Sequence, residues 1–328
     1  MTIKDKKVAL ITGINGQDGS YLAELLVDKG YQVWGTVKRN SVAENQTSRL
    51  DSIYDKIKDN LQYVDMTDLS SLVRIVQDAQ PDEIYNLAAQ SHVRVSFDQP
   101  IYTANTTGIG TLNLLEAARL IKPDVKIYQA SSSEMFGNNI DEDGYQRETT
   151  PMSPVSPYGC AKVFSYNICR NYRNSYNMFI SNGILFNHES LRRGSNFVTN
   201  KVAKTAVQIY KGQESELALG NLDAARDWGH AKDYVEAMWL LLQLPQSDDF
   251  VCATGISHTV RDLVVHVFKK LGLDWKKYVT QDDKFIRPEE LDVLKGDSTK
   301  LTKATGWAPT YTFENMMDEM VDHWLEVL

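Results

Sequence analysis

Short apolar runs alternate with amphipathic stretches through the first half of the chain. Runs such as KVALITG, YQVWGTV, DEIYNLAA and VKIYQAS are rich in β-branched and aromatic residues, which is typical of buried strands. Between them lie YLAELLVDKG and GTLNLLEAARL, in which apolar residues recur at helical spacing. Strands that alternate with helices of this length predict βαβ units. We therefore expect an α/β fold with a doubly wound parallel sheet that is covered by helices on both faces.

The alternation continues through a helix that begins near Tyr158 and a strand around FISNGILF, and then it loosens. Glycine and proline residues separate the later, shorter elements, which predicts a smaller mixed α/β domain. We place the first domain at residues 1–185 and expect segments at about 229–253 and 291–297 to return to it. The smaller domain would consist of about 186–228, 254–290 and 298–328.

The composition narrows the range of partners. Of the 328 residues, 42% are hydrophobic and 24% are charged, and the formal net charge is −8 without a long basic run. This charge argues against binding to nucleic acid or to an anionic membrane surface, so the expected partner is a small molecule. No stretch of about 18 apolar residues occurs, and the apolar run after MTIKDKK is too short for a signal peptide.

The cysteines and histidines show no metal-binding spacing. The three cysteines, Cys160, Cys169 and Cys252, are far apart and odd in number, which predicts reduced thiols in the cytoplasm. We expect no metal site, and we interpret five of the histidines as structural or surface residues, namely His92, His230, His258, His266 and His323.

A glycine-rich turn joins the first predicted strand to the first predicted helix. In ITGINGQDGS, Gly13 allows a tight turn, Gly16 lets backbone amides approach a pyrophosphate, and Gly19 permits close packing of helix on strand. Three glycines alone could form a turn without a ligand, but this junction of a doubly wound sheet is where a dinucleotide binds. The pattern predicts a Rossmann-type cofactor site formed by Gly13, Asn15, Gly16, Gln17, Asp18 and Gly19.

The end of the second predicted strand indicates which dinucleotide binds. An NAD site usually has an acidic residue about 20 residues after the glycines. Here WGTVKRNS has Lys38 and Arg39, followed by Asn40 and Ser41, and cations suit the 2′-phosphate of NADP. NADP is the expected cofactor, although the two cations could also be solvated loop charges. The next two strand ends would complete its site with Asp65, Met66, Leu87, Ala88, Ala89, Gln90 and Ser91.

A tyrosine and a lysine lie four residues apart at the start of a predicted helix in SPYGCAK. Tyr158 and Lys162 would therefore project from the same helix face. An ammonium group beside a phenol favours the phenolate, which would bring Tyr158 toward use as a base near neutrality. The stretch YQASSSEMFG adds a carboxylate, Glu134, directly after a predicted buried strand. Taken alone, the pair could also be an exposed helix pair without a role.

These motifs are similar to those of the extended short-chain dehydrogenase/reductase superfamily, with TGINGQDG at Thr12 to Gly19 and YGCAK at Tyr158 to Lys162. Within it the chain resembles the GDP-mannose 4,6-dehydratases over nearly its whole length. The strings that carry this resemblance include YNLAAQSHVRVSF, NGILFNHES, RRGSNFVT, LGNLDAARDWGHAKDYVEAMW and RPEELDVLKGD. The resemblance implies an NADP-dependent lyase that acts on GDP-mannose in deoxysugar synthesis and forms a homo-oligomer, either a dimer or a tetramer.

The resemblance also implies the roles of four residues. A 4,6-dehydratase oxidises the C4 hydroxyl of the sugar, eliminates water across C5 and C6, and returns the hydride to C6. Tyr158 would take the C4 hydroxyl proton, and Lys162 would hold the nicotinamide ribose and stabilise the phenolate. Glu134 would take the C5 proton and protonate the departing C6 hydroxyl, while Ser132 would bond to the C4 oxygen.

Further contacts follow from the resemblance alone. Tyr102, His188 and Arg193 match residues that touch the cofactor, and His188 to Arg193 and the loop near Arg39 would also approach a neighbouring subunit. The matching substrate residues are Ser91, Asn187, Val198, Lys201, Gly220, Arg226, Arg287 and Glu290. Of these, Asn187, Arg226 and Arg287 would hold the diphosphate, and Lys201 and Glu290 would lie toward the guanine and its ribose. Each arginine could instead form a surface ion pair.

Three positions depart from the patterns of related enzymes. Ser132 occupies a position where many relatives have threonine, which keeps the hydroxyl but loses the methyl group that restricts rotamers. Ala225 replaces a frequent basic residue beside Arg226. Ser133 occupies the position of a second acid in the related thymidine-diphosphate-glucose dehydratases. The loss of the methyl group leaves the preferred sugar open.

Three other functions remain open from the sequence. The same mechanism could act on another GDP-sugar such as a GDP-mannoheptose, which the pocket around Ser132 and Ser91 would decide. A nucleotide-sugar C4 epimerase shares the glycine turn and the Tyr158–Lys162 pair but needs no C5 base, so Glu134 argues against it. A non-catalytic NADP-sensing scaffold is expected to lack the tyrosine.

Overall fold

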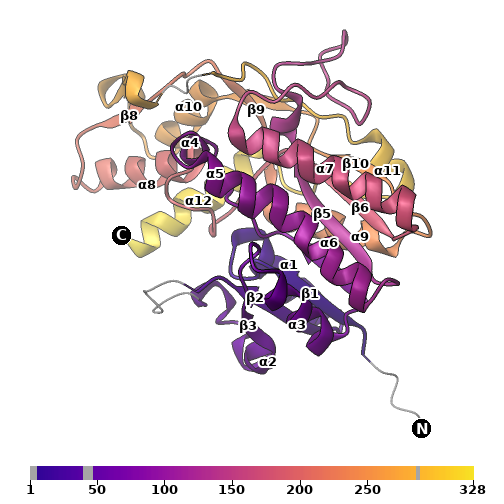
Figure 1. Ribbon diagram of the computed structural model, residues 1–328. Coiled ribbons are helices and arrows are strands. Elements are labelled where there is room, and N and C mark those ends of the chain that lie inside the picture. Colours follow the sequence, from indigo (N-terminus) through magenta and orange to yellow (C-terminus); the bar gives the residue numbers. More distant parts are fainter. Residues whose placement is uncertain (1–5, 40–46, 286–288) are drawn as a thin grey trace.

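A parallel sheet forms the centre of the fold (Figure 1). The computed structural model describes residues 6–39, 47–285 and 289–328, and within them seven strands lie in the order β10-β6-β5-β4-β1-β2-β3, each pair parallel. The expected doubly wound sheet is confirmed, and the order reverses beside β1, which has β2 and β4 on opposite sides. The strands are β1 (Val8–Thr12), β2 (Gln32–Val37), β3 (Leu61–Tyr63), β4 (Glu83–Asn86), β5 (Lys126–Ser132), β6 (Ile180–Leu185) and β10 (Asp249–Cys252).

Helices cover both faces of the sheet because successive strand residues point to opposite faces. Ala9 and Ile11 pack in the core beneath α1 and α9, whereas Leu10 packs in the core beneath α3, α6 and α7. In Figure 1, α6 and α7 run across the near face of the sheet. The helices are α1 (Gln17–Asp28), α3 (Leu69–Ala79), α6 (Gly110–Ile121), α7 (Pro157–Tyr176) and α9 (Ala231–Gln243).

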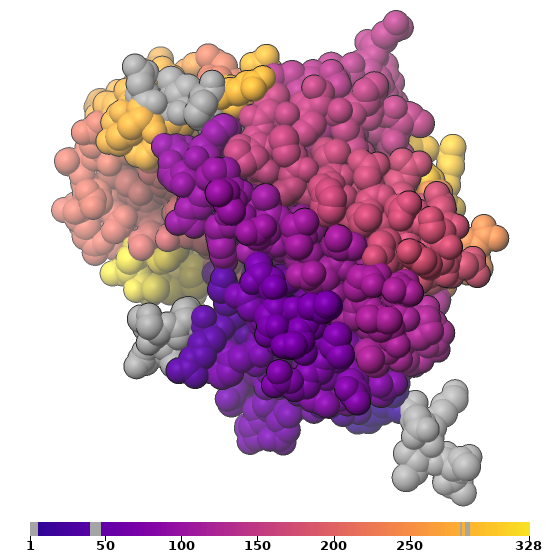
Figure 2. All heavy atoms as spheres, in the orientation of Figure 1, coloured from indigo at the N-terminus to yellow at the C-terminus, as the bar shows by residue number. Residues whose placement is uncertain are grey.

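In the described part of the second half, two small sheets and three helices form a separate apolar core. Strand β9 lies between β7 and β11, β8 pairs with β12, and α8, α10 and α12 pack around residues such as Trp228 and Phe268. Figure 2 shows most of the visible salmon-to-yellow atoms gathered at one side of the molecule. The elements are β7 (Asn187–Glu189), β8 (Leu217–Leu219), β9 (Ala225–His230), β11 (Ser257–Thr259), β12 (Val279–Gln281), α8 (Val198–Tyr210), α10 (Val260–Lys270) and α12 (Phe313–Val327).

Short helical segments connect the larger elements. After β4, a loop leads into α4 and α5, and α5 continues through the π-helical segment η3 into α6. Such π-helical turns are frequent at functional sites. The segments are α2 (Tyr54–Ile57), α4 (Val93–Asp98), α5 (Pro100–Thr103), α11 (Thr299–Thr305), η1 (Ser48–Leu50), η2 (Lys58–Asn60), η3 (Ala104–Ile109), η4 (Ser133–Phe136), η5 (Trp275–Lys277) and η6 (Asp283–Phe285).

The boundary between the two domains stays a proposal, with one revision. We expected a returning segment at 291–297 and placed 298–328 in the smaller domain. Leu301 of α11 and Trp307 instead pack in the core over the central sheet, together with residues of α1 and α9. We therefore propose that the returning segment extends to about Trp307 and that the smaller domain resumes before α12.

Candidate active site

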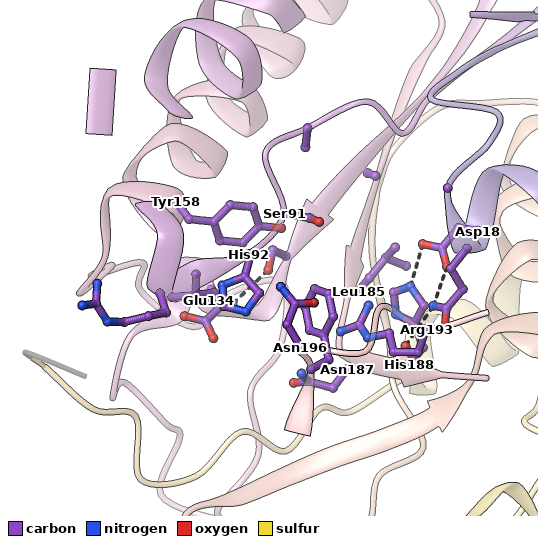
Figure 3. A pocket seen from close by; sticks show the side chains of 18 of the residues that line it. Asp18, Ser91, His92, Glu134, Tyr158, Leu185, Asn187, His188, Arg193 and Asn196 are labelled. Atoms are coloured by element: carbon purple, nitrogen blue, oxygen red, sulfur yellow. Dashed lines mark hydrogen bonds and ion pairs between the residues drawn. The ribbon is translucent and has the colours of Figure 1, made fainter. Parts of the chain in front are cut away.

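A cavity of about 850 Å³ lies at the carboxyl ends of the central strands and extends to the second core. Its walls come from the β1–α1 turn, the ends of β2, β4, β5 and β6, the start of α7, and parts of β7, α8 and β9. This is the crevice, beside the reversal of strand order, where doubly wound sheets bind ligands. Figure 3 shows two groups of side chains in it, Ser91, His92, Glu134 and Tyr158 on one side and Asp18 and His188 on the other.

The turn between β1 and α1 has the form of a dinucleotide cradle. Gly13 has a φ of 70°, in the left-handed region that favours glycine. A Cβ atom on Gly19 would lie 2.4 Å from the carbonyl oxygen of Gly13, so only glycine lets α1 pack this close to the turn. The first backbone N–H groups of a helix lack intrahelical partners and fit a pyrophosphate. All six residues predicted for this turn line the cavity.

Lys38 lies at one end of the cavity between two polar partners. Its Nζ donates to the hydroxyl of Tyr102 at 2.7 Å and lies 3.5 Å from the carboxylate of Asp65. These three residues and Met66 all line the cavity. The structure thus brings residues from the ends of β2 and β3 and from α5 together at one end of the cavity. This agrees with the sequence-based prediction that they contact one end of a dinucleotide.

The other cation of the pair is placed differently. Arg39 lies with its guanidinium 5.6 Å from the ring centre of Tyr63, and of the described residues it is not one that lines the cavity. Asn40 and Ser41, which we also expected at the cofactor, lie outside the described residues.

The loop after β4 is held by Thr12 and by Gln90. The backbone N–H groups of Leu87 and Ala88 both donate to Thr12 Oγ1 at 3.1 Å. Four of the five residues expected at the cofactor line the cavity, but Gln90 does not. Its side-chain amide bonds to both backbone groups of His92, because it turns back onto its own loop. In the described structure Gln90 braces the loop rather than forming a wall of the cavity.

The end of β5 turns Glu134 into the cavity. Ser132 is the last residue of β5, and its hydroxyl accepts the backbone N–H of Glu134 at 3.2 Å, which begins the tight turn η4. Ser132 is 9% exposed and Glu134 is 8% exposed, yet both line the cavity. A carboxylate held this deep, with one face toward the cavity, is suited to acid–base work on a bound ligand.

Tyr158 and Lys162 lie in the first turns of α7, and the start of this helix is fixed by its cap. The hydroxyl of Ser156 accepts a backbone N–H of the first turn at 3.0 Å, and Pro157 occupies the first helical position. Lys162 Nζ lies 5.7 Å from the ring centre of Tyr158 and donates to the carbonyl of Ala130 at 2.6 Å. The structure therefore brings the pair to the same wall as Glu134.

The electrostatics of this pair correct one expectation. Burial raises the pKa of Tyr158 to about 12, although a hydrogen bond with Ser132 acts in the opposite direction. Burial also lowers the pKa of Lys162 to about 8. We expected the ammonium group to favour the phenolate, but burial is the largest influence on the pKa of Tyr158, and Lys162 is not among the main groups that lower it. The phenol of Tyr158 therefore keeps its proton near neutral pH in this structure.

Replacing Lys162 by methionine is expected to stabilise the fold near neutral pH. The pKa of Lys162 falls from 10.5 to about 8 on folding, so the buried charge costs roughly 3 kcal/mol below that pH. Loss of the bond to Ala130 returns about 1 kcal/mol, which leaves a gain of roughly 2 kcal/mol. Urea unfolding at about pH 7 and about pH 9.5 measures it, and the gain should shrink at the higher pH because the lysine is then neutral in the folded state.

A matched control is Lys303→Met, which removes an exposed lysine of α11. It should change the free energy of unfolding by less than about 0.5 kcal/mol at either pH. A Lys162→Met protein that is less stable than the parent near pH 7, or equally stabilised at both pH values, would contradict the burial argument.

His188 forms a buried ion pair with Asp18 on the other side of the cavity from Glu134 (Figure 3). His188 Nε2 lies 2.7 Å from the carboxylate, and its Nδ1 donates to the carbonyl of Phe186 at 2.8 Å. Burial would raise the pKa of Asp18, but the charge and hydrogen bond of His188, together with Gln17 and Arg193, lower that pKa overall. Burial would lower the pKa of His188, and Asp18 outweighs it in turn. The pair is thus ionised and ties β7 to the first turn of α1.

Arg193 lines the cavity beside a buried carboxylate that the sequence did not single out. Its Nε lies 3.0 Å from Glu189, which also accepts the hydroxyl of Thr199 at 2.5 Å. The guanidinium lies 3.7 Å from the ring centre of Phe197. Burial raises the pKa of Glu189, although Arg193 opposes this. The guanidinium is therefore held in place from two sides.

The residues expected at the substrate line the far part of the same cavity. Lys201 Nζ donates to the carbonyl of Ala218 at 2.6 Å and lies 3.5 Å from the ring centre of Phe285. Arg226, on β9, is 7% exposed and donates to the carbonyl of Ala225 at 2.8 Å. Arg287 lies outside the described residues. The others that line the cavity are Ser91, Asn187, Val198, Gly220 and Glu290.

Sequence reasoning did not assign several residues that line the cavity. His92, expected to be structural or on the surface, lines the cavity, as do Glu189, Phe197 and Phe285. The signal for His92 was its place next to Ser91 at the carboxyl end of a strand. The other four histidines contact Glu319, Phe313, Asp318 and Trp324, respectively, for His230, His258, His266 and His323.

The described parts of the chain contain neither a group of metal ligands nor a membrane-spanning helix. No group of three or more His, Cys, Asp or Glu side chains there is arranged to hold a metal ion. Nor does that part contain a helix both long and apolar enough to cross a membrane.

The chain is similar over nearly its whole length to known enzymes of one family. A family profile described as GDP-mannose 4,6 dehydratase matches residues 10–320. The GDP-mannose 4,6 dehydratase of Cricetulus griseus is 48% identical over 350 residues, which covers 99% of this chain and 93% of that protein. GDP-mannose 4,6 dehydratase 2 of Arabidopsis thaliana is 49% identical over 335 residues, with coverage of 99% and 88%. The GDP-mannose 4,6-dehydratase of Vibrio cholerae is 47% identical over 356 residues, with coverage of 98% and 95%.

Solved structures share the fold at lower identity. The crystal structure of UDP-glucose 4-epimerase from Thermus thermophilus in complex with NAD gives a TM-score of 0.84 at 24% identity, covering 98% of this chain and 100% of that one. The dTDP-glucose 4,6-dehydratase of Streptomyces venezuelae, with NAD bound, gives 0.84 at 23% identity, with coverage of 98% and 97%. At these identities the likeness shows the fold alone.

Proposed function

The chain belongs to the GDP-mannose 4,6-dehydratase family, and on that premise we propose how its cavity is divided between cofactor and substrate. The protein is a lyase that converts GDP-mannose to GDP-4-keto-6-deoxymannose with loss of water. The observation that carries this conclusion is the identity of 48% over 99% of the chain to a protein of that activity. That the Tyr158–Lys162 pair and Glu134 share one cavity wall agrees with it.

One assay tests the activity. Purified protein is incubated with GDP-mannose, and the product is examined by mass spectrometry for the loss of one water and by its alkaline chromophore as a 4-keto sugar. GDP-mannoheptose, UDP-glucose and dTDP-glucose serve as competing substrates. Turnover of another GDP-sugar in place of GDP-mannose would overturn the substrate but leave the mechanism intact, whereas epimerised product without loss of mass would overturn the mechanism.

The enzyme uses a nicotinamide dinucleotide, and we propose that this is NADP. The glycine turn fits such a ligand, because the close approach of α1 leaves no room for a side chain at Gly19. The chemistry that this cofactor would supply is hydride transfer from C4 of the sugar and back to C6. In this proposal Lys38 holds the adenosine end together with Tyr102, where its positive charge suits a 2′-phosphate. Asp65 moderates that charge at 3.5 Å but also orients the lysine.

The choice of dinucleotide is expected to depend on Lys38. The Lys38→Met protein should bind NADPH about tenfold more weakly than the parent, because one charge-assisted contact to phosphate is lost, while NADH binding changes less than about twofold. Titration of cofactor-depleted protein, followed by fluorescence of the reduced nicotinamide, measures both. Lys29→Met, on the outer side of α1 against Trp239, is the control. Equal affinities of the parent for NADPH and NADH would contradict the NADP assignment.

The catalytic roles are proposed for four residues of one wall. Tyr158 takes the proton of the C4 hydroxyl as a phenolate, which its raised pKa makes the minor form near neutral pH. The bond to the carbonyl of Ala130 fixes Lys162, whose ammonium group would hold the nicotinamide ribose. Glu134 takes the C5 proton, which the C4 ketone has made acidic, and then protonates the leaving C6 hydroxyl. Ser132 donates to the C4 oxygen. Its hydroxyl already orients the backbone of Glu134, which supports a shared role.

The nucleotide part of the substrate is proposed to bind in the far part of the cavity. Buried Arg226, together with Asn187, would pair with the diphosphate, where two anionic groups need compensation. Lys201 and Glu290 would lie toward guanine and its ribose. His188 and Arg193 are proposed to border the cofactor, where the ionised His188–Asp18 pair adds no net charge.

Oligomeric state and location in the cell stay proposals. We propose a homo-oligomer, a dimer or a tetramer, supported by exposed apolar residues on three neighbouring segments, with Ile101 76%, Ile109 42% and Phe164 41% exposed. We also propose a cytoplasmic location, which free Cys160, Cys169 and Cys252 support.

A further inference from the structure

His92 borders the cavity on the same side as Glu134 and Tyr158, although no role has been given to it so far (Figure 3). The residue before it, Ser91, lines the cavity as well. This wall is where the proposed function places the hexose, so the inference drawn from His92 rests on that function. The nucleotide is assigned to a different part of the cavity, beside β9 and α8.

The backbone of His92 is fixed on both sides by one side chain. Its N–H donates to Gln90 Oε1 at 2.8 Å, and its carbonyl accepts Gln90 Nε2 at 3.0 Å. Gln90 is itself anchored, because Nε2 also bonds to Thr103 at 3.2 Å and its backbone N–H donates to Thr107 at 3.2 Å. Thr107 belongs to the π-helical segment η3. Such bracing from a neighbouring element is typical of a residue whose position matters.

The ring of His92 is fixed as well. Its Nδ1 accepts the backbone N–H of Val95 at 3.3 Å and so caps α4. The ring lies 5.2 Å from the ring of Phe197, tilted by 55°. Phe197 is the N-cap residue of α8, and the guanidinium of Arg193 packs against its ring. The imidazole therefore has one orientation relative to the cavity.

The bond to Val95 also determines where the imidazole proton lies. A ring nitrogen that accepts a hydrogen bond carries no proton, and a neutral imidazole then carries its proton on the other nitrogen. Nε2 of His92 is thus an N–H donor, and one ring carbon separates it from the capping atom. Capping alone does not explain a histidine here, because serine, threonine, aspartate and asparagine are the residues that cap helices best.

We propose that His92 binds the hexose, with Nε2–H donating to a sugar hydroxyl beside Glu134, and that Gln90 is the residue that positions it. Nδ1 holds the ring to α4, and Nε2 contacts the substrate. A neutral donor suits this place because it adds no charge next to Glu134, whose carboxylate must gain and lose a proton. The contact discriminates GDP-hexoses from GDP, which has no hexose to meet His92.

Two substitutions at His92 test the roles of the two ring nitrogens separately. In His92→Asn the amide replaces Nδ1 and can still cap α4, but it is too short to replace Nε2. In His92→Gln the amide nitrogen can take the place of Nε2 and keeps a donor near the sugar, at the cost of the cap. Each variant is measured for thermal unfolding, for kcat and KM with GDP-mannose, and for the affinity of GDP, all with NADP bound.

His92→Asn should unfold at the temperature of the parent and bind GDP with unchanged affinity, yet lose about tenfold in kcat/KM. His92→Gln should be less stable but regain most of that kcat/KM. A His92→Asn protein with parental kcat/KM overturns the proposal, and so does an equal loss of GDP affinity and of kcat/KM, which would indicate a general disturbance of the cavity. If the parent itself does not turn over GDP-mannose, the proposed function fails first, and this is visible before any variant is compared.

Discussion

Replacing Glu134 by glutamine is expected to stop the reaction after oxidation at C4. Tyr158 and Lys162 remain on α7, so the C4 hydroxyl can still lose its proton, but the amide cannot take the C5 proton or protonate the C6 hydroxyl. Product formation should fall by roughly a thousandfold or more. The reduced nicotinamide should accumulate on the protein, because the sugar never provides a C6 position to which the hydride can return. Its near-ultraviolet absorbance after mixing with GDP-mannose measures this.

A deuterium-exchange measurement and a control variant show whether the effect of Glu134→Gln comes from the loss of the acid and base. In deuterated water the parent should incorporate deuterium at C5 of the product, and Glu134→Gln should not exchange the C5 hydrogen of the bound ketone. Glu142→Gln, at an exposed loop position, is the matched control and should keep parental turnover. If Glu134→Gln formed product at more than about a tenth of the parental rate, another group would have to supply the acid and base.

Replacing Tyr158 by phenylalanine is expected to abolish even the first step. The phenyl ring keeps the volume that packs in the cavity wall but has no oxygen to take the C4 hydroxyl proton. The rate should fall by roughly a thousandfold or more, and, in contrast to Glu134→Gln, no reduced nicotinamide should accumulate. Stopped-flow absorbance with GDP-mannose distinguishes the two variants. Because only a hydroxyl in contact with Ser132 is lost, the free energy of unfolding should change by no more than about 1 kcal/mol.

The control for Tyr158→Phe lies on the same helix. Tyr176, at the last position of α7, is 51% exposed and far along the helix from the catalytic wall, so Tyr176→Phe should leave the rate unchanged. A Tyr158→Phe protein that still reduces the nicotinamide at the parental rate would show that the C4 proton goes elsewhere. Lys162, with a pKa of about 8, would then be the group to examine.

Local sequence was sufficient to predict those features whose residues lie close together in the chain. The glycine turn is one example, because Gly13 and Gly19 are needed by the geometry of a single βα junction. Tyr158 and Lys162 are another, since four residues of helix bring them to one face. Strand and helix periodicity likewise predicted the doubly wound sheet. Strands that are buried on both faces of a sheet appear in the sequence as nearly continuous apolar runs.

Contacts between distant segments could not be read in the same way. Gln90 was assigned to the cofactor by its place after a strand, but the direction of its side chain depends on His92 and on Thr103 and Thr107. His92 was interpreted as structural or on the surface, and its place at the cavity depends on how the loop after β4 folds against other segments. Leu301 and Trp307 were placed in the smaller domain, although their packing depends on where α11 meets the central sheet.

The sequence by itself determined the α/β fold, the turn proposed to bind a dinucleotide and the residue types of the wall to which catalysis is assigned. These depend on backbone geometry and on spacing within one element, which the order of residues fixes directly. Only the tertiary structure decided the protonation of Tyr158 and Lys162, the ion pair of His188 with Asp18, and the place of His92 at the cavity. The burial of a side chain and the charges near it depend on segments that are far apart in the chain, so no single stretch of sequence predicts them.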